Sequence, residues 1–221
     1  MRFLWFHALE LIVFFLAVLF LSDLKKFRLG GFAIYMFLVC VTELSASNSA
    51  FFGLKTNSPI YNCYILVSLL IVMYIFLGLL NYKGLVKKIY ITCCSAAIIF
   101  MLFDMVCIQG LMIFDSYGNI VVAFFEIILS VLLVGKLFLD DDDEVSILNN
   151  PYFWIAAGTL IFNMGSLVTM GLIQYIALKN IRIGGIILYR IIMPILIGIV
   201  YTCYGYSFIL CRKLTTRLSQ S

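Results

Sequence analysis

Seven long apolar stretches constrain what this 221-residue chain can fold into. A helix needs about 20 mostly apolar residues to cross a bilayer, and each stretch is close to that length or longer. Only 12% of the residues are charged, against about 25% in an ordinary soluble domain. Because so apolar a chain cannot cover itself with polar surface, lipid must be its solvent. The stretches cover residues 3–21, 32–50, 60–80, 89–108, 120–138, 152–177 and 184–210.

The connections between these stretches are short and contain turn-forming residues, such as Leu29-Gly30-Gly31 and Asn57-Ser58-Pro59. The first stretch resembles a signal peptide. However, Glu10 interrupts it and no small-residue cleavage site follows, so we expect it to be retained. The sequence therefore predicts an all-α polytopic membrane protein, a seven-helix bundle in which residues 1–221 form a single transmembrane domain.

The distribution of lysine and arginine predicts the orientation, because basic residues favour cytoplasmic loops and acidic residues contribute little. An N-terminus outside and a C-terminus in the cytoplasm give the inner side most of the basic residues. The inner set is Lys25, Lys26, Arg28, Lys83, Lys87, Lys88, Lys136, Arg212, Lys213 and Arg217. The outer set is Arg2, Lys55, Lys179 and Arg182.

Few residues are suited to catalysis or to metal binding. His7 is the only histidine, and the seven cysteines lie in or beside apolar stretches without CxxC spacing, so we expect free thiols and neither a metal nor another cofactor. No GxSxG motif is present. A retinal protein needs a lysine in its last helix, where this chain has Pro194, Gly198 and Tyr201. The chain has no basic stripe for nucleic acid. We therefore expect no catalytic residues, although a carboxylate-based lipid hydrolase stays open.

Ionisable residues lie inside the predicted spans, where one charge costs about 2.5–3.5 kcal/mol even on lenient insertion scales. With the predicted orientation they fall in the outer half of the bundle, whereas the inner half is almost purely apolar. Small and polar residues at helical spacing favour positions that face protein rather than lipid. The candidate ligand-binding residues, including three polar orienting groups, are Glu10, Glu43, Tyr61, Asn62, Asp104, Glu126, Asn163 and Arg190.

This set holds four carboxylates and one guanidinium, so protons, a cation or an amine-bearing ligand would have to balance its charge. Three interpretations stay open. In the first, Arg190 pairs with one acid and the other acids lie at helix ends near lipid headgroups. In the second, the residues line a ligand pocket. In the third, they form a proton or ion pathway.

An acidic run lies on the inner connection after residue 138. Such runs are typical of solvated loops, and the alternatives are a docking site for a basic cytoplasmic partner or a weak divalent-ion site. The candidate partner-contact residues are Asp140, Asp141, Asp142, Asp143 and Glu144.

Two segments carry a family resemblance: Phe114-Asp115-Ser116-Tyr117, and Asn149-Asn150-Pro151-Tyr152-Phe153-Trp154-Ile155-Ala156-Ala157-Gly158. They resemble the turn before the fifth helix and the start of the sixth helix in a group of small seven-span inner-membrane proteins of Bacteroidota bacteria. Glu43 and Tyr61-Asn62-Cys63-Tyr64 match further positions, and the resemblance is strongest over residues 105–176.

The resemblance implies a multi-pass protein of the bacterial inner (cytoplasmic) membrane. Because members of the group are often encoded beside sensor histidine kinases, it also implies a membrane histidine kinase as partner. Two positions depart from the group. Ser68 stands where a carboxylate is expected, and Arg190 stands where the group tends to have a neutral polar residue, so the charge balance of a pocket would differ.

These features favour a membrane sensor or signalling-accessory protein with a polar pocket open to the periplasmic side. A small or cationic ligand would shift the helix packing, with Pro194 as a kink, and the change would pass to a partner through helix contacts. The alternative is a small solute or ion-coupled transporter, in which polar groups should continue through the inner half. A membrane-embedded lipid hydrolase is the weaker alternative.

Overall fold

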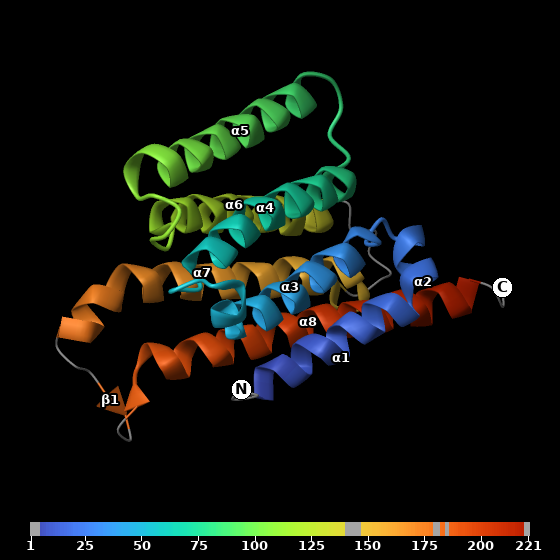
Figure 1. The fold of residues 1–221 in the computed structure, drawn as a ribbon. Helices are drawn as coiled ribbons and strands as arrows, with labels where there is room; N and C mark the ends of the chain where they lie inside the picture. The colour runs from blue at the N-terminus through green and yellow to red at the C-terminus, as the bar shows by residue number, and fades with distance from the viewer. Residues whose placement is uncertain (1–4, 140–146, 179–181, 184–185, 219–221) are drawn as a thin grey trace.

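The chain is almost entirely helical in a computed structural model, which describes residues 5–139, 147–178, 182–183 and 186–218 (Figure 1). Five residues of π-helix (Asp104–Ile108) extend one of the α-helices, and short 3₁₀ turns cover Ser49–Phe52 and Ile147–Asn149. In chain order the main elements are α1 (Trp5–Leu19), α2 (Leu21–Lys26), α3 (Gly31–Ser47), α4 (Ser58–Leu80), α5 (Gly84–Phe103), α6 (Ser116–Leu139), α7 (Pro151–Leu178), β1 (Arg182–Ile183), β2 (Ile186–Ile187) and α8 (Tyr189–Leu218).

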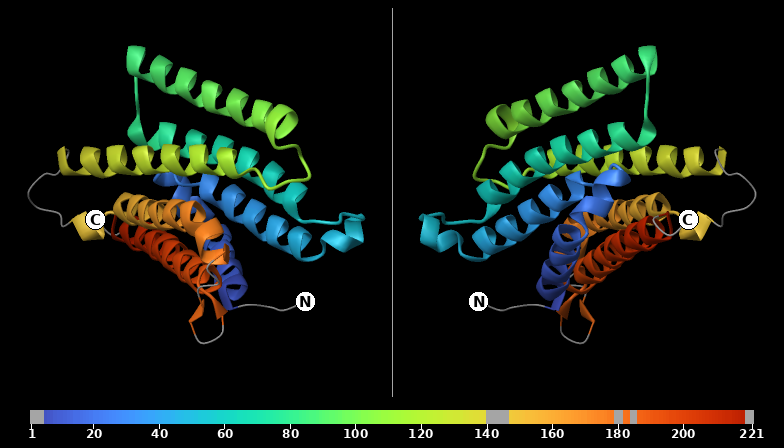
Figure 2. Two further views of the ribbon diagram at one scale, coloured as in Figure 1. Left: turned by 90° about the vertical axis from the view of Figure 1, so that its left-hand side faces the viewer. Right: turned by 90° about the vertical axis from the view of Figure 1, so that its right-hand side faces the viewer.

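The long helices are stacked in successive layers (Figures 1 and 2). α1 and α8 form one outer layer, α3 and α7 the next, and α4 and α6 the third, while α5 lies alone on the far side. The side chains of α5 that face outward include Ile89, Ile99 and Phe103, all more than half exposed. An apolar face of this kind is expected where lipid is the solvent.

Five helices are long and apolar enough to cross a membrane: Ser58–Leu80, Gly84–Ile108, Ser116–Leu139, Pro151–Leu172 and Ile191–Leu218. The remaining two of the seven predicted stretches correspond to α1 and α3, which are apolar but have only 15 and 17 residues. At about 1.5 Å per residue they extend about 22 and 26 Å, which is less than the hydrocarbon thickness of about 30 Å. The helical class is confirmed, and the described residues contain five helices that by length and composition could span a membrane.

The last predicted stretch begins too early. Residues 184–210 were expected to be one span, but β1 and β2 pair in an antiparallel hairpin before α8 begins at Tyr189. Gly184 and Gly185 separate the paired residues in the sequence, a composition that favours a two-residue hairpin turn.

The ten basic residues of the predicted inner set lie on segments that meet at one end of the bundle, called here the basic end. Long-range contacts hold these segments together. Arg212 Nη1 lies 3.2 Å from Asp23 Oδ2, and Arg28 Nη1 donates to the Gly78 carbonyl at 3.1 Å. The Lys136 ammonium group donates to the carbonyls of Leu79 and Leu80, which end α4. Cations near the carbonyl end of a helix are favourable.

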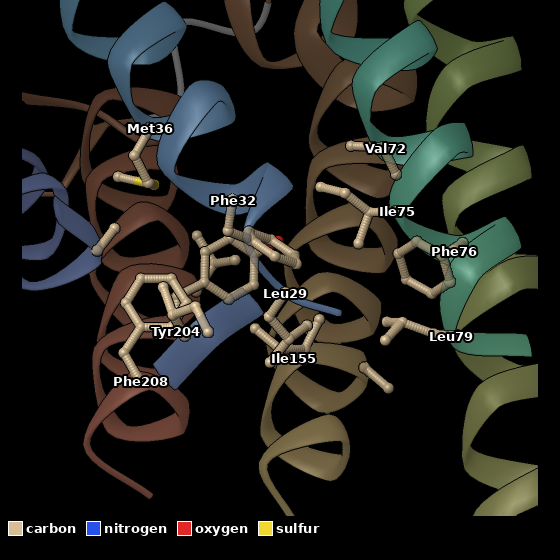
Figure 3. Packing of buried hydrophobic residues seen from close by; sticks show 14 of the residues in the cluster. Leu29, Phe32, Met36, Val72, Ile75, Phe76, Leu79, Ile155, Tyr204 and Phe208 are labelled. Carbon is tan, nitrogen blue, oxygen red and sulfur yellow. The ribbon is translucent and has the colours of Figure 1, made fainter. Parts of the chain in front are cut away.

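Large apolar side chains fill the core next to the basic end (Figure 3). Phe32 of α3 contacts Tyr204 and Phe208 of α8, with ring centroids 5.0 and 6.1 Å apart. We call the fully buried residues of this region the apolar layer. Its members are Leu29, Phe32, Phe76, Ile155 and Phe208.

A glycine allows α3 to approach α4 at the basic end. A Cβ atom on Gly31 would lie only 2.7 Å from Ile75 Cγ1, so a larger residue would force the two helices apart. Small residues at such crossings are typical of membrane helices, where close backbone contact replaces the hydrophobic driving force.

Candidate functional site

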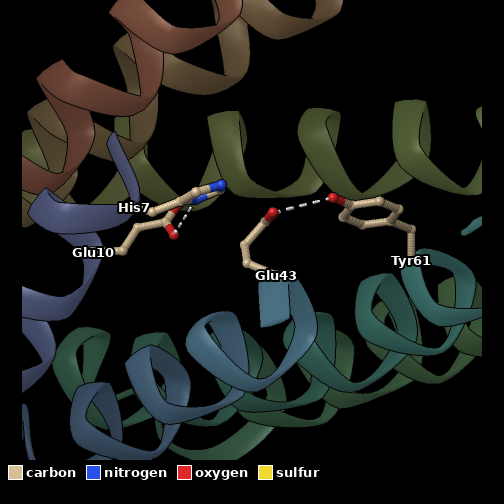
Figure 4. A network of polar contacts seen from close by, with 4 residues as sticks. All are labelled: His7, Glu10, Glu43 and Tyr61. Atoms are coloured by element: carbon tan, nitrogen blue, oxygen red, sulfur yellow. Dashed lines mark hydrogen bonds and ion pairs between the residues drawn. The ribbon is translucent and has the colours of Figure 1, made fainter. Parts of the chain in front are cut away.

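Two carboxylates from different helices meet at the end of the bundle opposite the basic end (Figure 4). Glu10 of α1 is 3% exposed, and its Oε2 atom lies 3.4 Å from Nδ1 of His7, three residues earlier. Glu43 of α3 accepts hydrogen bonds from the Tyr61 hydroxyl of α4, at 3.3 and 3.2 Å to its two oxygens. We call these four residues the acid site.

Helical periodicity explains why both carboxylates point into the bundle. The buried residues of α1 are Glu10, Val13 and Ala17, which form one stripe with spacings of three and four residues. On α3, Glu43 is half-buried and follows the buried Cys40 by three residues. Glu10 therefore occupies a position that an apolar residue would otherwise take, whereas Glu43 is only partly covered.

A small cavity separates the two carboxylates. Its volume is about 30 Å³, and its lining residues are His7, Glu10, Leu11, Cys40, Glu43, Leu44 and Ser47. A single water occupies about this much space, whereas pockets for organic molecules measure about 300–1,000 Å³. The cavity can take a water or a small cation. It has no room for a larger ligand in this arrangement of the helices.

The charge of the acid site needs compensation. Glu10 and Glu43 repel each other, and the cation beside them is His7, which is charged only when it is protonated. Among the described residues no group of three or more histidine, cysteine or acidic side chains could hold a metal ion. A proton or a weakly held cation is therefore the chemistry that this cavity can accommodate.

A second buried acid lies deeper in the bundle. The carboxylate of Glu126 on α6 accepts a hydrogen bond of 2.7 Å from the amide of Asn163 on α7. That amide also donates to the Thr159 carbonyl, and the Thr159 hydroxyl lies 2.8 Å from the hydroxyl of Tyr204. We call this the Glu126 network.

Tyrosines fill the space between the acid site and the Glu126 network. The hydroxyls of Tyr35 and Tyr64 lie 3.4 Å apart, and the ring of Tyr204 lies 6.5 Å from that of Tyr35 and 6.3 Å from that of Tyr201. Tyr204 also contacts Thr159 of the Glu126 network through its hydroxyl. We call these four tyrosines the tyrosine cluster.

A third group forms where the π-helical turn meets the start of α6. The amide of Asn62 donates to the carbonyls of Leu111 and Ile113, and its oxygen accepts the Asp115 N–H at 2.9 Å. Asp115 caps α6 by accepting the Gly118 N–H. Asn62 therefore fastens the loop between α5 and α6 to α4.

In each of two carboxyl groups of this third group, one oxygen has no hydrogen-bond donor in the described structure. Gln109 donates to Asp104 Oδ2 at 2.9 Å, but Asp104 Oδ1 and Asp115 Oδ2 are buried and receive no N–H or O–H donor in the described structure. The two carboxyls interact directly, so one proton held between them would satisfy both oxygens.

The stability of the protein should depend on the ionisation of Asp115. Burial, with the contact to the Asp104 carboxyl, raises the pKa of Asp115 from its ordinary value of 3.8 to about 6. An acid with a raised pKa holds its proton more tightly in the folded state, so the free energy of unfolding falls as pH rises between these values. Asp115→Asn should remove this fall, which thermal unfolding in detergent at a series of pH values would measure.

A matched change separates ionisation from capping. Asp115→Asn keeps an acceptor for the Gly118 N–H, whereas Asp115→Ala loses the cap at every pH and should cost about 1 kcal/mol. Asp115→Asn that leaves the pH dependence intact would show that another group causes it.

The predicted site residues are thus divided rather than gathered. Glu10, Glu43 and Tyr61 form the acid site, Glu126 and Asn163 form the network, and Asn62 and Asp104 belong to the loop group. Glu126 was expected less than two turns from the helix start. Because the Asp115 cap begins α6 at Ser116, Glu126 lies ten residues along it, about 15 Å deep.

Some expectations fall on residues or side chains that the structure does not describe. Arg190 begins α8, but its side chain lies outside the described part, and so do Asp140, Asp141, Asp142, Asp143 and Glu144. Ser68, where the resemblance implies a carboxylate, is buried and donates to the Ile65 carbonyl. The sequence interpretation missed Asp115 and the tyrosine cluster as polar partners, and only the turn before α6 gave a signal for Asp115.

Comparison of the chain with protein-family models, with curated proteins and with solved structures finds no match.

Proposed function

We propose that this chain is a membrane sensor that takes up a proton or a small cation at the acid site and passes the change to a membrane partner. One observation supports it above the others: two carboxylates from α1 and α3 share a cavity of about 30 Å³. Neutralising either acid would remove a repulsion between two helices that otherwise meet through apolar side chains. This narrows the expected small or cationic ligand to a proton or a bare cation.

The packing around α1 suggests how the change is transmitted. Glu10 lies five residues after Trp5, whose ring fits against Gly198 of α8, where a Cβ atom would approach to 2.8 Å. A shift of α1 toward or away from α3 would therefore also move its contact with α8. Uptake at the acid site would bias two packings of the same helices, as a ligand with different affinity for two states does.

The placement in the membrane is part of the proposal. We propose that α1 and α3 also span the membrane, in addition to the five longer helices. They are shorter by one or two turns, which local thinning of the bilayer would accommodate. The basic end would be cytoplasmic, which puts the N-terminus and the acid site on the periplasmic side of an inner membrane. The resemblance to Bacteroidota proteins suggests a membrane histidine kinase as the partner.

A small ion-coupled transporter is the second candidate, and the tyrosine cluster favours it, because its hydroxyls form two pairs, Tyr35 with Tyr64 and Tyr204 with Thr159 of the Glu126 network. The apolar layer counts against it. Beyond Tyr204 the side chains of Phe32, Phe208 and Ile155 carry no polar group, and the buried hydroxyl of the neighbouring Ser207 donates to the Pro151 carbonyl.

The sensor proposal predicts that Trp5 reports the state of the acid site. The chain has two tryptophans, and Trp154→Phe would leave Trp5 alone on α1. In phosphatidylcholine nanodiscs, Trp5 emission should change in one step during a titration from about pH 4 to about pH 9, or on addition of Na⁺, K⁺ or Ca²⁺. The step should disappear in the Glu10→Gln/Glu43→Gln variant, because neither side chain can then change its charge.

Two variants serve as controls. Asp104→Asn removes an acid from the loop group and should leave the step in place. His7→Gln removes the neighbouring imidazole and should shift the midpoint without abolishing the step. Trp5 emission that changes with neither pH nor cations would contradict the proposal that the acid site is the sensing site. So would a step in emission that is still present in Glu10→Gln/Glu43→Gln.

A further inference from the structure

A large cavity at the basic end is lined by cations from two sides. It measures about 610 Å³ and lies among the end of α2, the start of α3, the end of α4 and the start of α5. Its volume falls in the usual range of ligand pockets. The lining residues are Lys25, Arg28, Gly30, Gly31, Ile34, Tyr74, Ile75, Leu77, Gly78, Asn81, Tyr82 and Lys87.

The charge of the cavity has one sign. Lys25, Arg28 and Lys87 contribute three positive charges, and no carboxylate is among the described residues that line it. The nearest acid on α2, Asp23, is buried and paired with Arg212 instead. Within the described structure the ammonium groups of Lys25 and Lys87 make no hydrogen bond or ion pair, so their donors are available to an anion.

Arg28 is held in position at this cavity. Its guanidinium donates one hydrogen bond to the Gly78 carbonyl, which fixes the group against α4 and leaves its other N–H donors unused. Arg28 has a φ of 58°, in the left-handed region that a residue with a Cβ atom seldom adopts. This residue lies at the end of α2, where the Leu29 N–H donates to the Leu24 carbonyl at 2.8 Å and closes the helix.

The cavity also has an apolar side. Ile34 and Tyr74, which are 63% and 74% exposed, lie on the outer surfaces of α3 and α4 beside it. Ile75 and Leu77 continue the apolar lining. A ligand that fits both sides carries a negative head at the level of the three cations and a hydrocarbon part along α3 and α4.

We infer that this cavity binds the phosphate headgroup of an anionic phospholipid, with Lys25, Arg28 and Lys87 around the phosphate and the acyl chains against Ile34 and Tyr74. Basic pockets between membrane helices are suited to such headgroups, and each Lys or Arg near an anionic surface adds about fivefold to binding. The bound lipid would bridge α3 and α4 to α5, which is otherwise the outermost helix.

Lipid binding to the full chain in nanodiscs tests this inference. Native mass spectrometry would count the phosphatidylglycerol molecules retained after exchange into phosphatidylcholine. The matched control is Lys26→Gln/Lys88→Gln, which has the same net charge and changes neighbouring residues outside the cavity. Phosphatidylglycerol should bind Lys25→Gln/Lys87→Gln about tenfold more weakly than it binds this control. Equal weakening in the two variants would mean general attraction to a basic surface and would overturn the inference.

Two further arms identify the source of the phosphate and the role of Arg28. Phosphatidylglycerol should raise the thermal midpoint, and inorganic phosphate at the same concentration should not; a rise with inorganic phosphate alone would overturn the lipid assignment. Arg28→Gly relieves the left-handed backbone, so it should keep its thermal midpoint in phosphatidylcholine while losing phosphatidylglycerol. Full retention of the lipid by Arg28→Gly would contradict the assignment of this residue.

Discussion

Asn62→Ala should lower the free energy of unfolding by roughly 2–4 kcal/mol. The side chain of Asn62 is completely buried and makes three hydrogen bonds to the backbone of the loop between α5 and α6. Alanine would leave two carbonyls and the Asp115 N–H without these partners, and each buried polar group left unpaired costs about 1–3 kcal/mol. Unfolding by SDS in mixed micelles, followed by circular dichroism, would measure the loss.

The chain provides matched variants for this measurement. Asn48 is exposed and makes one hydrogen bond, to the Leu44 carbonyl, so Asn48→Ala should change stability by less than about 0.5 kcal/mol. Asn62→Asp keeps the acceptor for the Asp115 N–H, but it loses both donated hydrogen bonds and buries a carboxyl against two carbonyl oxygens, so it should destabilise the protein at least as much as Asn62→Ala. If Asn62→Ala is no more harmful than Asn48→Ala, then Asn62 does not fasten the loop.

Asn62 also shows what sequence patterns can and cannot predict. Its polarity inside an apolar stretch identified it as a residue with a specific role, and we expected it to orient a ligand. Its partners lie 49–53 residues away on a loop, and no local periodicity encodes such a contact. The pairing of His7 with Glu10 was predictable because both lie on one turn of one helix.

The helices themselves followed from the apolar stretches because lipid forces each spanning segment to satisfy its own backbone. Their ends were less predictable. The second stretch was expected to reach residue 50, but α3 ends at Ser47, where the Asn48 side chain bonds to the Leu44 carbonyl and a 3₁₀ turn follows. Serine and asparagine compete with the helix by such local hydrogen bonds, which a count of apolar residues overlooks.

The described site residues lie in three separate groups for a related reason. Depth can be counted along a sequence, so acids on several helices were placed in the same half of the bundle. The direction of each side chain depends on which helices are neighbours, and that is a property of the fold. α5 carries Asp104 toward α6, while α1 and α3 bring Glu10 and Glu43 together.

Phe32→Ala should both destabilise the protein and open a path for protons. Phe32 is 1% exposed, and its ring packs between Tyr204 and Phe208 in the apolar layer. Removing a buried phenylalanine costs about 3–5 kcal/mol in soluble cores through lost contacts and a residual cavity. The new space would lie just beyond the tyrosine cluster, where water can continue toward the basic end. Vesicles containing a pH-sensitive dye would measure the leak after a pH jump.

The wild-type protein separates the two candidate functions in the same assay. If the protein is a sensor, vesicles that contain the wild type should be as impermeable to protons as empty vesicles. Vesicles with Phe32→Ala should leak protons, because the apolar layer separates the hydroxyls of the tyrosine cluster from the basic end. Phe37→Ala is the matched control, since Phe37 lies on the same helix but is 56% exposed, and it should stay tight. The transporter would instead be favoured if the wild-type protein conducts protons and Glu10→Gln/Glu43→Gln does not. The acid site would then lie on a proton path that crosses the apolar layer.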